Sequence, residues 1–111
     1  MAFIYLSERN RSFEEFLDVC AQANARRADI LLDLLEQFIS SEGKSGAYLR
    51  GDDARGAYVV PSAHRLSSIG GYALLIFVEN GAVIEVQPWE DEELLARWNE
   101  VLLRIEQRLG L

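Results

Sequence analysis

Apolar residues recur at helical spacing along the first third of the chain, after a short apolar segment at residues 2–6. They fall on one face of a helix, and acidic and polar residues take the opposite face. Ser12 and Glu15 have the spacing of a capping box, in which each side chain bonds to the backbone amide of the other. The predicted apolar face comprises Phe13, Phe16, Leu17, Cys20, Leu31, Leu34, Leu35 and Phe38.

The middle of this predicted helix is polar, because Asn24 and Arg27 project on its apolar side. Either the helix breaks near residues 23–28, or this stretch extends beyond the core and contacts solvent or a partner. No glycine or proline lies within residues 12–42, which favours one continuous long helix that stops at Gly43.

Two short apolar segments follow and predict a pair of strands. Residues 47–50 and 57–60 flank a turn segment, residues 51–56, that is rich in glycine and aspartate. Pro61 ends the second strand, because proline cannot donate to a strand ladder.

A second hairpin is predicted around Asn80 and Gly81, the preferred pair for a tight turn that needs positive φ at both positions. Its strands are residues 72–78 and 83–86. The turn predicts a register that pairs Val78 with Val83, Phe77 with Ile84, Ile76 with Glu85 and Leu75 with Val86. The face expected in the core carries Ala73, Leu75, Phe77, Ala82, Ile84 and Val86. The second face carries Tyr72, Leu74, Ile76, Val78, Val83, Glu85 and Gln87.

The last segment predicts an amphipathic helix that begins at Pro88 and ends at Gly110. Four acidic residues in its first turn complement the positive end of the helix dipole: Glu90, Asp91, Glu92 and Glu93. Apolar residues then recur at helical spacing: Leu94, Leu95, Trp98, Val101, Leu102, Ile105 and Leu109. Two ion pairs are expected on the outer face, Glu93 with Arg97 and Glu100 with Arg104.

These elements predict a single α+β domain over residues 1–111. Its antiparallel sheet has three to five short strands, with a long N-terminal helix and a C-terminal amphipathic helix. The pattern leaves open whether residues 2–6 join the sheet.

Net charge and cysteine content narrow the kinds of partner and the cellular compartment that we expect. Eighteen acidic and 11 basic side chains give a formal net charge of −7, which disfavours nucleic-acid binding and favours a partner with a basic surface. One cysteine, Cys20, cannot form an internal disulfide, so a reducing cytoplasm is the expected compartment. We see no signal peptide and no stretch long enough to cross a membrane.

Candidate chemistry in the sequence is sparse. His64 is the single histidine, and Cys20 lies on the predicted apolar face, where a thiol usually behaves as an inert core group. The spacing of a zinc or calcium site is absent, and Asp52 and Asp53 read as turn residues. We therefore expect no enzymatic activity, no cofactor and no metal, and we identify no family resemblance.

The second face of the hairpin is the most informative feature for function. If both helices pack on the opposite face, its apolar side chains form an exposed patch of the kind that marks an interface. If one helix covers each face, the patch is buried. The predicted partner-binding residues are Tyr72, Leu74, Ile76, Val78, Val83, Glu85, Trp89, Glu90, Asp91 and Glu92.

The size, charge and predicted fold class match those of small acidic bacterial and phage proteins that dock onto another protein. Immunity proteins, antitoxins, secretion chaperones and inhibitors of host defence are examples. A non-enzymatic module that occludes a partner surface, as a homodimer or in a heterocomplex, is therefore the first hypothesis. The alternative is a small-molecule-binding domain or small enzyme, with a pocket between the sheet and the first helix lined by Asn24, Arg27, His64 and Arg65.

Overall fold

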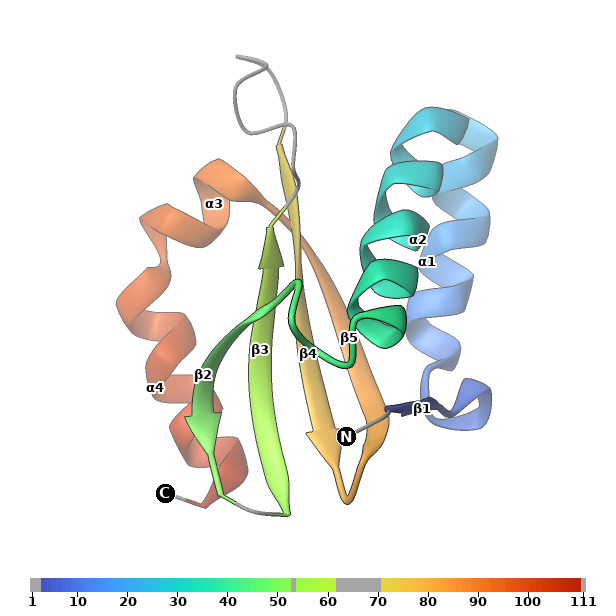
Figure 1. Ribbon diagram of the computed structural model, residues 1–111. Coiled ribbons are helices and arrows are strands. Elements are labelled where there is room, and N and C mark those ends of the chain that lie inside the picture. Colours follow the sequence, from blue (N-terminus) through green and yellow to red (C-terminus); the bar gives the residue numbers. More distant parts are fainter. Residues whose placement is uncertain (1–2, 53, 62–70, 111) are drawn as a thin grey trace.

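A five-stranded sheet lies between two layers of helices in the computed structural model, which describes residues 3–52, 54–61 and 71–110 (Figure 1). The strand order is β1-β5-β4-β3-β2. Helices α1 and α2 cover one face of the sheet, and α3 and α4 cover the other (Figure 1). The elements in chain order are β1 Ile4–Tyr5, a 3-10 turn η1 Ser7–Arg9, α1 Arg11–Ala23, α2 Ala25–Ser40, β2 Ala47–Gly51, β3 Arg55–Pro61, β4 Tyr72–Glu79, β5 Ala82–Glu90, α3 Asp91–Ala96 and α4 Trp98–Leu109.

The predicted α+β class is confirmed, but the sheet is mixed and not purely antiparallel. The apolar segment at the start of the chain forms β1, which pairs with β5 in the parallel direction, with Ile4 opposite Ala82 and Tyr5 opposite Val83. The other three pairings are antiparallel. Parallel pairing needs no tight turn, so no local signal in residues 2–6 specifies it.

The prediction of one long N-terminal helix is wrong, because the chain reverses at Asn24. The Asn24 amide donates to the Cys20 carbonyl (2.6 Å) and ends α1, while its side chain accepts from the Arg27 amide (3.1 Å) and caps α2. Asparagine is a strong N-cap residue and can end one helix and begin the next without glycine or proline. The helices pack on each other, and the buried side chains of Cys20 and Ala28 flank the turn.

The start of α1 also differs from the predicted capping box. The N-cap is Asn10, and Ser12 is already in the helix. The Asn10 side chain is buried and donates to the carbonyls of Leu6 (2.7 Å) and Val83 (2.9 Å). It therefore supplies a hydrogen bond to the edge of β5 beyond the end of β1. Nearby, hydrogen bonds from Ser7 and Tyr5 hold the pKa of the Glu14 carboxyl below its ordinary value.

Asn10→Ala is expected to destabilise the protein by about 2 kcal/mol. The substitution leaves the buried carbonyl of Val83 without this donor, and an unsatisfied buried acceptor costs about 1–3 kcal/mol. Asn99→Ala, on the exposed surface of α4, is the matched control and should change the free energy of unfolding by less than about 0.5 kcal/mol. Urea unfolding followed by circular dichroism measures both. Equal unfolding midpoints for the two variants would show that the hydrogen bonds of Asn10 contribute nothing to the stability of the protein.

A β-bulge changes the predicted register of the second hairpin. The pairing of Val78 with Val83 is confirmed, but Phe77 pairs with Glu85 and not with Ile84. Ile84 is therefore an extra residue on β5, and every later residue of this strand turns to the face opposite the predicted one. Val86 accordingly packs against α1 and α2 rather than beside Leu75.

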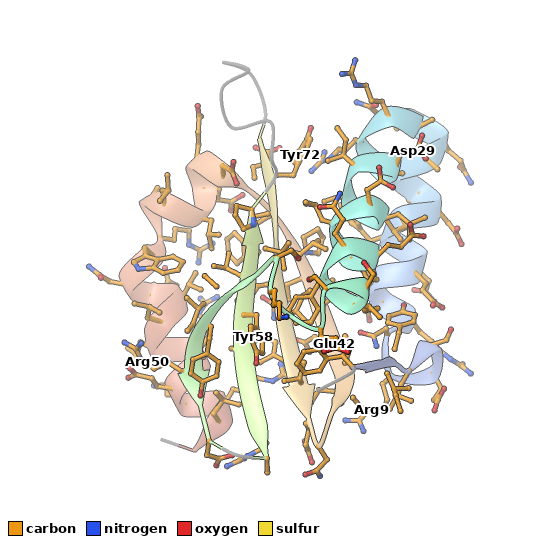
Figure 2. The ribbon with its side chains drawn as sticks, in the orientation of Figure 1. Arg9, Asp29, Glu42, Arg50, Tyr58 and Tyr72 are labelled. Atoms are coloured by element: carbon orange, nitrogen blue, oxygen red, sulfur yellow. The ribbon has the colours of Figure 1, made fainter. Side chains whose placement is uncertain are left out.

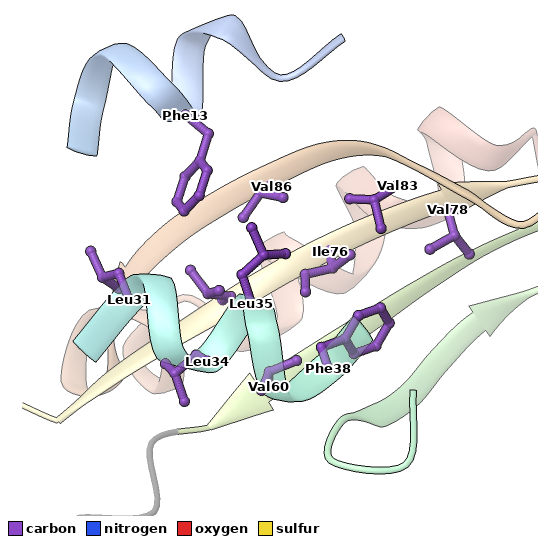
Figure 3. Close-up of a cluster of buried hydrophobic side chains, with 11 residues drawn as sticks. Phe13, Leu31, Leu34, Leu35, Phe38, Val60, Ile76, Val78, Val83 and Val86 are labelled. Carbon is purple, nitrogen blue, oxygen red and sulfur yellow. The ribbon is translucent and has the colours of Figure 1, made fainter. Parts of the chain in front are cut away.

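Both faces of the hairpin are buried, so of the two arrangements that the sequence left open, the one in which helices cover each face is the observed one. Ile76 and Val83 lie in the first core cluster, on the face of the sheet that α1 and α2 cover (Figure 3). This cluster comprises Phe13, Leu31, Leu34, Leu35, Phe38, Val60, Leu74, Ile76, Val78, Val83 and Val86. The cluster on the other face comprises Ala57, Ala73, Leu75, Phe77, Leu94, Val101, Ile105 and Leu109. The physical reason is that α1 and α2 fold back on each other as a pair and together cover the second face of the hairpin.

The C-terminal helix begins later than predicted and is interrupted. Pro88 lies in β5 opposite Leu74, and α3 begins at Asp91. At Arg97 the backbone (φ −111°, ψ 19°) departs from helical values and separates α3 from α4. The predicted stop is confirmed, because Gly110 caps α4 in the left-handed conformation (φ 74°).

Candidate functional site: a groove between α4 and β5

The residues predicted to bind a partner separate into three places. Leu74, Ile76, Val78 and Val83 are buried under α1 and α2, and the half-buried Tyr72 packs against them. Glu85 and Trp89 lie on the α4 side of the sheet, because the bulge at Ile84 turns them there. The remaining three, Glu90, Asp91 and Glu92, lie at the junction of β5 and α3.

Two of the four predicted pocket residues, Asn24 and Arg27, lie in the described part of the chain, so the predicted pocket stays a prediction. Asn24 caps α2, and the Arg27 guanidinium lies over the rings of Tyr72 (4.8 Å) and Phe16 (5.8 Å), with Glu90 at 3.8 Å. The Nε atom of Arg27 is buried without a hydrogen-bond partner. His64 and Arg65, with the whole loop between Pro61 and Gly71, lie outside the described residues.

A groove of about 470 Å³ lies between α4 and the strands β4 and β5. Its apolar lining comes from both layers, with Leu75 and Phe77 from the sheet and Val101 and Ile105 from the helix. Its remaining lining residues are Gln87, Trp89, Arg104, Gln107 and Arg108. We call this site the α4 groove. A volume of this size suits a small ligand or one to two large side chains.

A chain of hydrogen bonds orders the β5 wall of the α4 groove. The Trp89 indole donates to Gln87 (3.4 Å), and the Gln87 amide donates to the Glu85 carboxylate (2.6 Å). Arg108 donates to the same carboxylate (2.8 Å), and its guanidinium lies 4.6 Å from the centre of the Phe77 ring. These contacts fix the polar groups around an apolar floor, which is typical of a preorganised binding site.

A second network of charges follows α4 beside the α4 groove. Both predicted ion pairs are confirmed: Arg97 lies 3.7 Å from Glu93, and Arg104 lies 2.6 Å from Glu100. Arg97 also pairs with Glu100, and its hydrogen bonds hold the pKa of the Glu100 carboxyl below its ordinary value. Acidic and basic side chains therefore balance along this side of the helix, in a chain whose formal net charge is −7.

The sequence pattern could not place this site. Strict alternation puts Gln87 and Glu85 on the face of Ile76, under α2, and only the bulge turns them toward α4. Because Ile84 and its neighbours have ordinary strand propensity, the sequence carries no signal for the extra residue. The arginines at positions 104 and 108 lie one helical turn apart, which is the part of the site that helical spacing does reveal.

Metal-ligating side chains do not gather in the described part of the chain. Cys20 is free and buried, and no group of three or more His, Cys, Asp and Glu side chains among the described residues could hold a metal ion. Within residues 3–52, 54–61 and 71–110, no helix is both long and apolar enough to cross a membrane.

Comparisons with known proteins add no functional information. No family model matches the chain, and the searches of curated proteins and of solved structures found no significant match. The α4 groove is therefore the observation from which function is inferred.

Proposed function

We propose that the protein is a non-enzymatic binding module that docks onto another protein through the α4 groove. The observation that carries the proposal is the groove itself, in which the half-buried Trp89 and the ordered polar side chains of Gln87 and Arg108 surround a floor of buried apolar residues. A partner segment would insert a large apolar side chain there and exclude water from the floor. An anchor of this kind, surrounded by polar groups, is typical of interface hot spots.

The partner that fits this proposal carries a basic surface. A net charge of −7 steers a positively charged protein toward the chain and accelerates encounter. The balanced charges along α4 do not repel either sign at close range. Long-range attraction thus comes from the whole molecule, and the α4 groove supplies the anchor. Inhibitors, immunity proteins and chaperones of the cytoplasm act by this kind of occlusion, so we place the protein in that broad functional class.

Gln107→Trp is the variant that tests the α4 groove. Gln107 is exposed on α4 and lines the groove, so a tryptophan there fills the space without replacing a core side chain. Proteins retained by the wild type from its native host are identified by mass spectrometry, and affinity is then measured by calorimetry. We expect the variant to weaken binding at least about thirtyfold, the effect of losing one hot spot.

The control is Gln37→Trp, which makes the same change on the exposed surface of α2, on the other face of the sheet. It should bind within about twofold of the wild type, inside the usual range for a neutral surface substitution. Light scattering of the free protein shows whether the partner is a second copy. If Gln107→Trp binds as tightly as the control, or if no protein is retained and the chain stays monomeric, the proposal is wrong.

A small-molecule-binding domain is the second candidate. It is favoured by the volume of the α4 groove and by the guanidinium groups of Arg104 and Arg108 at its border, which suit an apolar molecule with an anionic group. The two candidates differ in what the same purification retains. A small organic anion, found without a protein and lost from Gln107→Trp, would favour this candidate.

A further inference from the structure

A second hollow, of about 510 Å³, lies between the sheet, α3 and the start of α4. The sheet contributes to it from β3 and β4, at the end of these strands that lies beside α3 (Figure 1). Tyr72, labelled in Figure 2, begins β4 at this end of the sheet. The lining residues are Val59, Ala73, Asp91, Leu94, Leu95 and Trp98. We call this site the α3 hollow, and it shares no lining residue with the α4 groove.

The lining of the α3 hollow is apolar at every position but one, and part of it is accessible. Leu95 is 74% exposed, and the side chains of Trp98 and Val59 are half-buried, whereas Ala73 and Leu94 belong to the core. The volume lies within the range of roughly 300–1,000 Å³ that is usual for small-molecule sites. The α3 hollow therefore offers accessible apolar surface in a space that suits a small ligand.

Asp91 is the one charged side chain in the lining of the described hollow. Its amide donates to the Gly71 carbonyl (2.9 Å), and a Cβ atom at position 71 would collide with its carboxylate. The carboxylate therefore packs directly on the backbone of Gly71. Among the described residues, no arginine or lysine forms an ion pair with Asp91, and no donor bonds to its carboxylate. Its position is fixed, but its charge has no partner in this part of the chain.

The polarity of α3 does not account for the placement of this carboxylate. Glu92 and Glu93 lie in the same first turn, but both are exposed and neither lines the α3 hollow. Asp91 is instead half-buried, beside apolar side chains that offer it no hydrogen bond. A partly desolvated carboxylate without a counter-charge is costly, so a ligand that brings a cation to it is favoured.

We propose that the α3 hollow binds a small organic amine, with its ammonium group on Asp91 and its apolar body against Leu95 and Trp98. The ammonium donates a charge-assisted hydrogen bond to the carboxylate, and the apolar body of the ligand excludes water from this ion pair. The formal net charge of −7 also attracts cations to the protein. The inference goes beyond the proposed function and does not rest on it, because the two sites share no residue.

The probe is phenethylamine, compared with its neutral isostere phenethyl alcohol. Binding to the full chain is followed by NMR through the two tryptophan indole N–H signals, since Trp98 lines the α3 hollow and Trp89 lines the α4 groove. We expect the amine to shift the Trp98 signal with a Kd on the order of 1 mM, and to bind roughly tenfold more tightly than the alcohol. This preference should shrink as salt is added, because it is electrostatic.

Two variants test the role of the Asp91 carboxylate. Asp91→Asn removes the charge but keeps the size of the side chain, and should bind the amine and the alcohol within about twofold of each other. Glu92→Gln is the matched control, since it removes one negative charge from the next residue of the same turn, outside the α3 hollow. It should keep the preference for the amine. Circular dichroism confirms that both variants are folded, and an equal loss of preference in both would overturn the inference.

Failure of this site and failure of the α4 groove give different results. Gln107→Trp, which fills the α4 groove, should leave binding of phenethylamine unchanged. A shift of the Trp89 signal in place of the Trp98 signal would put the amine in the α4 groove and contradict the inference. N-acetyl-lysine amide identifies the other source of an ammonium group: if it binds more tightly than phenethylamine, the hollow takes a protein side chain and not a small amine. Equal binding of the amine and the alcohol by the wild type would also show that the inference is wrong.

Discussion

Ile76→Asp is expected to unfold the protein at neutral pH. Ile76 lies in β4 with an exposed fraction of 0%, packed between the sheet and α2 (Figure 3). An aspartate there must hold an unpaired carboxylate in an apolar core, and the cost of several kcal/mol is comparable with the whole stability of a domain, about 5–15 kcal/mol. Far-UV circular dichroism and urea unfolding measure the effect.

Ile4→Asp is the matched control for this substitution. It makes the same chemical change on β1, where the side chain is 64% exposed, and should leave the protein folded. Burial would raise the pKa of an aspartate at position 76 above its unfolded value of about 4, so the stability difference from wild type should shrink as the pH falls toward that value. If Ile76→Asp unfolds at the same urea concentration as Ile4→Asp, the second hairpin face is not covered as described.

Phe38→Ala is expected to destabilise the protein by about 3–5 kcal/mol, the usual cost of removing a buried phenylalanine ring. Phe38 has an exposed fraction of 0%. Its ring lies 5.1 Å from the rings of both Phe3 and Tyr58, so the cavity opens at the centre of the aromatic contacts. Urea unfolding should show a lower midpoint with an unchanged slope.

Phe16→Ala removes the same ring from an outer position and serves as the comparison. Phe16 is 36% exposed, and the guanidinium of Arg27 lies 5.8 Å from the centre of its ring. We expect a loss of about 1 kcal/mol. A similar loss for both variants would mean that the ring at position 38 is not part of a close-packed core.

Local chemistry predicted the turns well, because a turn depends on a few neighbouring residues. Asn80 and Gly81 adopt the positive φ values (51° and 80°) that their types favour, and Val78 pairs with Val83 beside them. Asp52 orders the turn between β2 and β3, as its turn reading implied. Prediction became wrong only one residue farther along β5, at Ile84, where the twist and pairing of the whole sheet decide whether a residue bulges.

The helix ends likewise divide into those that neighbouring residues specify and those that tertiary packing decides. Gly110 stops α4 where the sequence predicts, because glycine alone accepts the left-handed cap at low cost. In the sequence, Asn24 can be read as a polar interruption of one long apolar face or as the N-cap of a new helix. The choice between those readings depends on whether folding α1 back against α2 buries more apolar surface than one straight helix does, and a local pattern does not contain that comparison.

The sequence by itself determined the α+β class, the strands of both hairpins, the apolar stripe of α4 and the acidic charge, because each depends on residue type and on periodicity over a short range. Tertiary structure alone decided which surfaces remain open. The pairing of α1 with α2 buried the face around Ile76, and the bulge at Ile84 turned Glu85 and Gln87 toward α4. Whether a side chain is exposed depends on how the helices pack on the sheet, and the residues that meet in this packing lie far apart in the sequence.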